Sequence, residues 1–131
     1  MAKLTDAQKR FLDEPFVGVA TTIRDDGSPH STVVWVDQED DYVEFNTARG
    51  RAKPRNLERD PRATLTVVDP QNPYRWLSVT GHAELVDEGA DDHIDRLAKK
   101  YLGKDEYPWD KDGRVTVRIK PEKVDAYGLD E

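Results

Sequence analysis

Residues Thr32-Val33-Val34-Trp35-Val36 form a continuous run of β-branched and aromatic side chains. Such residues favour a pleated strand, and successive side chains of a strand point to opposite faces. Val33 and Trp35 therefore face one way, and Val34 and Val36 face the other. A strand that is apolar on both faces is normally covered on both. We therefore expect a barrel wall with a further layer outside it, which in a chain of 131 residues a second copy could supply.

Further strands flank this run along the chain. Residues 16–23 form the preceding strand, and the Asp25-Asp26-Gly27 turn signal predicts a hairpin between the two. Similar patterns predict strands at 42–47, 62–68, 76–86, 115–119 and 124–127, with polar turns or loops at 38–41 and 69–73. Capping and periodicity predict helices at 5–12, near 54–59 and at 89–102. Residues 1–131 are therefore predicted to form one mainly β domain, an antiparallel barrel of six or seven strands with a few α-helices.

The composition limits the class of protein. Hydrophobic and charged residues each make up 36% of the chain, and the net charge is -7. No apolar run is long enough to span a bilayer, and the first residues show no apolar signal region, so we expect a cytoplasmic protein without membrane contact. The chain has no cysteine, which excludes disulfides and thiolate metal sites. The acidic balance argues against nucleic acid as a partner.

The segment from Arg49 to Arg62 reverses this charge. It holds six Lys or Arg against two Glu or Asp, a net of +4, which leaves -11 for the rest of the chain. A predicted strand ends at Thr47, Gly50 supplies a turn, and a short helix begins near Pro54. Free amides at a helix start, together with Arg and Lys side chains, make a phosphate site. Charge alone leaves two alternatives open, a solvated helix that pairs with the acidic remainder and a nucleic-acid patch.

The residues of this region resemble a known family. The stretch Phe45-Asn46-Thr47-Ala48-Arg49-Gly50-Arg51-Ala52-Lys53-Pro54-Arg55-Asn56-Leu57-Glu58-Arg59-Asp60-Pro61 is similar to the phosphate-binding stretch of the pyridoxamine 5'-phosphate oxidase-like split-barrel superfamily, whose fold is the FMN-binding split barrel. The following stretch Val67-Val68-Asp69-Pro70-Gln71-Asn72-Pro73-Tyr74-Arg75-Trp76 resembles the small deazaflavin-dependent reductases, which use coenzyme F420. The first pattern is specific to the superfamily, but it separates F420 from FMN much less well.

The resemblance implies where a cofactor binds. It implies a homodimer with two cofactor sites at the interface, and a cofactor phosphate held by Arg51, Lys53 and Arg55, with Thr47 and Arg49 close by. It implies a ring system lying along Thr32, Val33, Val34 and Trp35, and reached by Trp76 from the partner subunit. Trp76 lies on the outward face of its predicted strand, which fits contact with a partner. Ordinary interface packing is the alternative for Trp76, and core packing is the alternative for Trp35.

The resemblance also implies an activity. The expected enzyme transfers a hydride between reduced F420 and an unsaturated small-molecule acceptor, and the cofactor carries that chemistry. An FMN-dependent oxidase or reductase of the same fold is one alternative, and a flavin or tetrapyrrole carrier without turnover is another. The C-terminal Arg-rich segment of the vitamin-making oxidases is not found here, so we expect no synthesis of vitamin B6.

No residue is marked as the proton donor, and the catalytic residues stay unknown at this point. His30, His82 and His93 are candidates by type only; His82 is preferred because it shares a strand face with Trp76, and His93 is expected to be structural. Three scattered histidines without cysteine predict no zinc site. The aromatics of Tyr107-Pro108-Trp109 could line a substrate pocket or simply pack as a loop.

Overall fold

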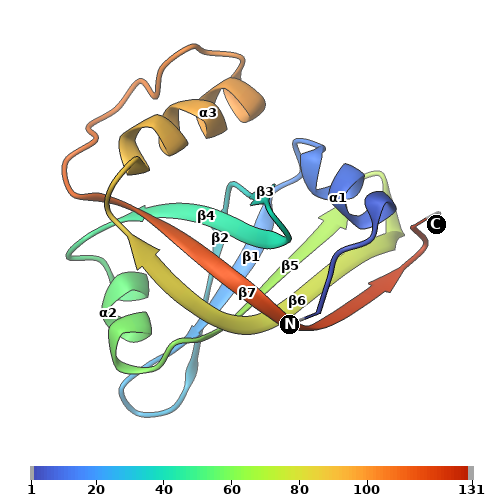
Figure 1. Cartoon of the computed structure of the whole chain (residues 1–131), viewed down its shortest axis with the longest axis horizontal. Coiled ribbons are helices and arrows are strands. Elements are labelled where there is room, and N and C mark those ends of the chain that lie inside the picture. The colour runs from blue at the N-terminus through green and yellow to red at the C-terminus, as the bar shows by residue number, and fades with distance from the viewer. Residues whose placement is uncertain (1, 130–131) are drawn as a thin grey trace.

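Seven antiparallel strands form one sheet that curves into a barrel, with three helices around its ends, in a computed structural model that describes residues 2–129 (Figure 1). The strands are β1 (Gly18–Ile23), β2 (Pro29–Val34), β3 (Asp37–Glu39), β4 (Tyr42–Ala48), β5 (Arg62–Asp69), β6 (Asn72–Val86) and β7 (Arg114–Tyr127). The helices are α1 (Asp6–Asp13), α2 (Ala52–Arg59) and α3 (Ala90–Leu102). The order across the sheet is β2-β1-β5-β6-β7-β4-β3. The prediction of a mainly β, antiparallel fold with a few helices is confirmed.

The interior is built from alternate residues of these strands. Phe45, Leu65, Leu77 and Ile119 are almost fully buried in one apolar cluster, as the period of two along a strand requires. Val34 and Val36 point into this core, whereas Val33 is 67% exposed. The predicted division of the two faces of this run is therefore confirmed.

The helix ends follow their sequence signals. Thr5 caps α1 with a reciprocal capping box, in which Gln8 N donates to Thr5 Oγ1 and Thr5 N donates to Gln8 Oε1. The helix α3 ends at Gly103, whose φ of 71° is the left-handed conformation that favours glycine. Among residues 2–129, no helix is both long and apolar enough to cross a membrane.

Two strand predictions are wrong in their bounds. The predicted strands 115–119 and 124–127 are one continuous strand, β7, which pairs with β6 along both parts. The register shifts between Thr80 and Gly81 because Glu122 of β7 is an extra residue there, which forms a β-bulge. A Cβ on Gly81 would lie 1.9 Å from Lys120 O, so the close approach of the two backbones requires glycine. The predicted turn 38–41 includes the short strand β3, which pairs with β4 through a tight turn at Asp40 and Asp41, both with positive φ.

Candidate functional site

A cleft of about 220 Å³ opens where the ends of β2 and β4 meet α2, α3 and the start of β7. Its walls are formed by Val33, Val34, Trp35, Asn46, Thr47, Arg51, Lys53, Ile94, Leu97, Tyr107, Trp109 and Arg114. The pairing of β4 with β7 brings the two halves together, since Ala48 lies opposite Arg114 and Arg49 N donates to Gly113 O at 2.8 Å. Segments more than 60 positions apart in sequence therefore share one cleft.

Three cations line one end of this cleft: Arg51, Lys53 and Arg114. Lys53 Nζ donates to Thr32 Oγ1 at 2.9 Å, and Arg114 Nε donates to Asn46 Oδ1 at 2.8 Å. Within residues 2–129, none of the three forms a salt bridge with a carboxylate. These cations therefore have no carboxylate in direct contact among the described residues, in a chain that is acidic overall.

The backbone and Thr47 add hydrogen-bond donors to the same end. Arg51 is the N-cap of α2, no side chain caps the first amides, and the first turn holds no acidic residue. The positive end of the helix is thus available to an anion. Thr47 is 1% exposed, and its Oγ1 has no hydrogen-bond partner among the described residues. A buried hydroxyl without a partner is costly, so the cleft suits a ligand that brings phosphate oxygens.

Aromatic side chains form a further part of the cleft wall. Trp35 stacks on Tyr101 with ring centroids 5.4 Å apart and an interplanar angle of 6°, and it meets the edge of Tyr107 at 6.1 Å. Tyr107 packs in turn against Trp109 and lies under the guanidinium of Arg114. Burial raises the pKa of Tyr101 to about 12, so its hydroxyl stays protonated and donates to Phe16 O at 2.7 Å. A flat, apolar ring system fits against such a wall.

The structure brings together most of the predicted site residues. Val33, Val34, Trp35, Thr47, Arg51 and Lys53 line the cleft, and Thr32 holds the Lys53 ammonium. Arg49 points elsewhere, into ion pairs with Glu58 and Asp87. Arg55 is exposed on α2 and is outside the lining set. Trp76 is half-buried on β6, outside the cleft of its own chain.

Several cleft residues escaped the sequence reasoning. Arg114 and Asn46 line the cleft and are hydrogen-bonded to each other. Ile94 and Leu97 of α3 add apolar side chains to the lining. The loop aromatics Tyr107 and Trp109, for which a pocket and a packed loop were both open, line the cleft. Arg114 is a cation at the first residue of β7, opposite the end of β4 that leads into the basic segment. This position is the signal that could have identified it.

The histidines lie away from these walls. None of the three lines the cleft. His82 is exposed, and its Nδ1 lies 2.7 Å from Glu122 Oε1. The preference for His82 as proton donor therefore has no support within the cleft of its own chain. His93 is buried on α3, 1% exposed, as expected for a structural residue.

Anion binding in this cleft should depend on the protonation of Lys53. Burial lowers the pKa of the Lys53 ammonium below its usual 10.5, and the guanidiniums of Arg51 and Arg114 lower it further. The charged form binds phosphate, so affinity should be full below the lowered pKa and should fall as the pH rises through it, before pH 10.5. Titration of the protein with F420 across this pH range measures the effect. Lys53→Arg should flatten the profile, because a guanidinium stays charged; an equal pH dependence in that variant would contradict the assignment to Lys53.

Comparison with known proteins agrees with this geometry. The family model of pyridoxamine 5'-phosphate oxidase matches residues 4–128. An F420H(2)-dependent biliverdin reductase of Mycobacterium tuberculosis (strain CDC 1551 / Oshkosh) is 31% identical over 127 residues, which cover 93% of this chain and 87% of that protein. The solved structure of an F420 reductase is 30% identical and superposes with a TM-score of 0.83, covering 93% of this chain and 98% of the other. A conserved hypothetical protein of Mycobacterium tuberculosis is 26% identical, with a TM-score of 0.75 over 95% of this chain and 84% of its own. The predicted split-barrel fold and the predicted superfamily are both confirmed.

Proposed function

Because the chain belongs to the pyridoxamine 5'-phosphate oxidase family, we propose that it is an F420-dependent oxidoreductase that transfers a hydride from reduced F420 to an unsaturated small-molecule acceptor. The observation that carries this proposal is a cleft lined by aromatic side chains and by three cations that form no salt bridge within residues 2–129. The two relatives at 30–31% identity are named for F420, and they support F420 over FMN as the cofactor.

Different residues of the cleft would bind the phosphate and the ring system of the cofactor. Arg51, Lys53 and Arg114 would hold the cofactor phosphate, with the Thr47 hydroxyl and the first amides of α2 as further donors. Val33, Val34 and Trp35 would pack along the ring system. When bound, the deazaflavin supplies the hydride chemistry. Among residues 2–129 no histidine lines the cleft, so we assign delivery of the proton to water entering from its open side.

A second copy of this chain would complete the site. The outer face of the sheet carries an apolar patch that consists of Val17, Val19, Val33, Val68, Trp76 and Tyr127. The register places them on one face, because Val19 lies opposite Val33, Val68 opposite Trp76, and Trp76 opposite Tyr127. Exposed apolar patches of this kind mark interaction surfaces. Val33 belongs to both the patch and the cleft, so a homodimer through the patch would bring Trp76 of the partner subunit toward the cofactor.

The first experiment measures cofactor choice and turnover. Purified protein is titrated with F420 and with FMN, and oxidation of the reduced cofactor is followed with biliverdin, quinones, enones and nitroaromatics. We expect tight binding of F420 and acceptor-dependent oxidation; biliverdin is the first acceptor to test because of the relative's name. Stoichiometric uptake of FMN without F420 binding would support the FMN alternative. F420 binding without any acceptor-dependent rate would support a carrier.

The cytoplasmic location stays a prediction from the sequence.

A further inference from the structure

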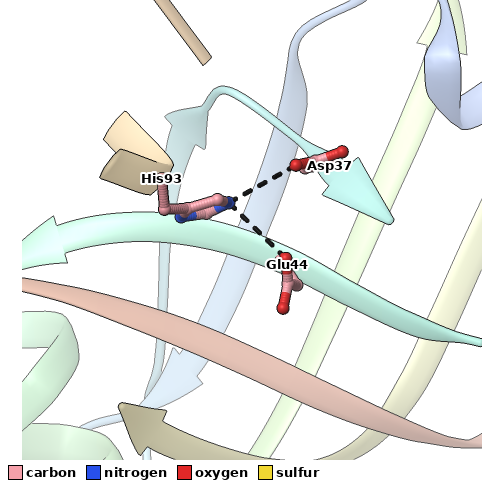
Figure 2. A group of neighbouring side chains, drawn as sticks. All are labelled: Asp37, Glu44 and His93. Carbon is pink, nitrogen blue, oxygen red and sulfur yellow. Dashed lines mark ion pairs between the residues drawn. The ribbon is translucent and has the colours of Figure 1, made fainter. Parts of the chain in front are cut away.

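The structure assigns a divalent-metal site to Asp37, Glu44 and His93, on the far side of Asn46 from the cofactor cleft. The three side chains come from three elements, β3, β4 and α3, and converge on one point (Figure 2). His93 Nε2 lies 3.6 Å from Asp37 Oδ2 and 3.6 Å from Glu44 Oε1. The three ligand atoms all lie within 4.8 Å of one another.

The spacing suits a metal better than direct hydrogen bonds. A distance of 3.6 Å is too long for a hydrogen bond from a ring N–H to a carboxylate. Two ligands about 2.1 Å from a tetrahedral zinc ion are separated by roughly 3.4 Å, which is close to the distances from Nε2 to both carboxylates. His93 and Glu44 are 1% and 3% exposed, and Nε2 and Oε1 have no hydrogen-bond partner among the described residues. Two buried polar atoms are thus aimed at the same empty position.

The other atom of each ligand is held by a neighbour. Arg118 Nε donates to Glu44 Oε2 at 2.7 Å, and Gln38 N donates to Asp37 Oδ1 at 2.8 Å. Each carboxylate therefore keeps one oxygen free, and both free oxygens face Nε2. Such outer contacts orient metal ligands in known sites. Asp37 lies directly opposite Glu44 across β3 and β4, where like charges repel, so a divalent ion between them would relieve a repulsion that Arg118 offsets from the Glu44 side alone.

The other ring nitrogen of His93 has polar neighbours. Asn46 Nδ2 lies 3.1 Å and Thr116 Oγ1 3.2 Å from His93 Nδ1. The Asn46 amide itself donates to Ala90 O and accepts from Arg114, which fixes its orientation. These contacts hold the imidazole ring with Nε2 turned toward the two carboxylates.

One His and two carboxylates on a divalent ion leave a coordination position open. Glu44 and His93 line a surface depression of about 260 Å³, together with Glu39, Glu88, Arg96 and Arg118. The cluster therefore borders this depression, while Nε2 and Oε1 themselves are buried. Imidazole with carboxylates suits zinc and similar first-row metals. Three histidines scattered along the sequence predict no zinc site, because such a prediction requires several histidines together. The proposed site contains only one histidine, with two carboxylates.

Metal binding is tested on the full chain after treatment with a chelator. Zn²⁺ is titrated calorimetrically, and Co²⁺ is titrated by visible absorption. We expect one equivalent of Zn²⁺, a Co²⁺ spectrum of low coordination number, and a rise in Tm with Zn²⁺ concentration. NMR of the imidazole nitrogens should show a change in the His93 Nε2 resonance as Zn²⁺ is added.

The variants distinguish this site from adventitious binding. Asp37→Asn and Glu44→Gln keep the shape of the side chains but remove a charged metal ligand. Loss of a residue that only hydrogen-bonds to a ligand weakens metal binding about 10- to 100-fold, so each of these variants should weaken Zn²⁺ binding by at least that factor. Glu39→Gln removes an exposed carboxylate from the same depression and should leave the affinity unchanged. Circular dichroism confirms that each variant is folded. The proposal is overturned if the wild-type protein takes up no Zn²⁺ at millimolar concentration. It is also overturned if Asp37→Asn and Glu44→Gln bind Zn²⁺ as the wild type does. In either case, a His93 that carries protons on both nitrogens would show that the three side chains form an ion-pair cluster without a metal.

Discussion

Replacing Lys53 with alanine should weaken F420 binding by about 1.5 to 3 kcal/mol, the usual range for a hydrogen bond to a charged group, or roughly 10- to 150-fold in Kd. The ammonium is half-buried at the cationic end of the cleft, and its one hydrogen-bond partner among residues 2–129 is Thr32 Oγ1 at 2.9 Å. Because no carboxylate of the described chain forms a salt bridge with it, the charge is available to the ligand. The measurement is a fluorescence or calorimetric titration with F420.

Arg62→Ala is the matched control for this prediction. It removes one positive charge from the same basic segment, but Arg62 is exposed and its guanidinium is paired with Asp60 at 2.7 Å. Both variants change the long-range field of the protein equally, so only a local contact can separate them. We expect Arg62→Ala to bind F420 as the wild type does. An unchanged Kd in Lys53→Ala would instead restore the interpretation of the segment as a solvated, charged surface.

Replacing Val19 with aspartate should dissociate the proposed homodimer. Val19 is 41% exposed in the middle of the apolar patch, opposite Val33 on β2 and Thr66 on β5. In a two-fold dimer the substitution occurs twice in one interface, and burying an unpaired carboxylate costs several kcal/mol. We expect the dimer dissociation constant to rise on the order of 100-fold or more. Sedimentation velocity at micromolar concentration measures it.

The same variant tests whether the dimer completes the cofactor site. If Trp76 of the partner subunit contacts the ring system, monomeric Val19→Asp should also bind F420 more weakly. Leu102→Asp is the control, since Leu102 is likewise 41% exposed but lies on α3 and is not part of the patch on the sheet. That variant should keep both the dimer and the affinity. A wild-type protein that is monomeric at all accessible concentrations would rule out the interface proposal.

Much of the fold follows from local signals in the chain. The capping box of Thr5 and Gln8, the glycine after α3 and the alternation of residues 77–85 all act within a few residues, so their structural outcome could be predicted. The bounds that failed depend on distant neighbours. β7 continues through Pro121 because it pairs with β6 across the bulge at Glu122, and β3 forms because β4 lies beside it.

The candidate site divides in the same way. Charge and local signals along the chain predict a basic segment between the end of a strand and the start of a helix, and this segment resembles a phosphate-binding stretch. Which of its cations face the cleft depends on tertiary contacts. Arg49 forms ion pairs with Asp87 and Glu58. Arg114, from a distant part of the chain, lines the cleft together with Arg51 and Lys53.

The physical reason lies in the range of the interactions. Helix caps, turns and strand alternation are fixed by hydrogen bonds and sterics between near neighbours in sequence. The cleft and the Asp37, Glu44 and His93 cluster depend instead on the register between β4 and β7 and on the packing of α3 over them. Charge counted along the chain therefore identified the basic segment, and strand pairing selected the residues that can bind a ligand.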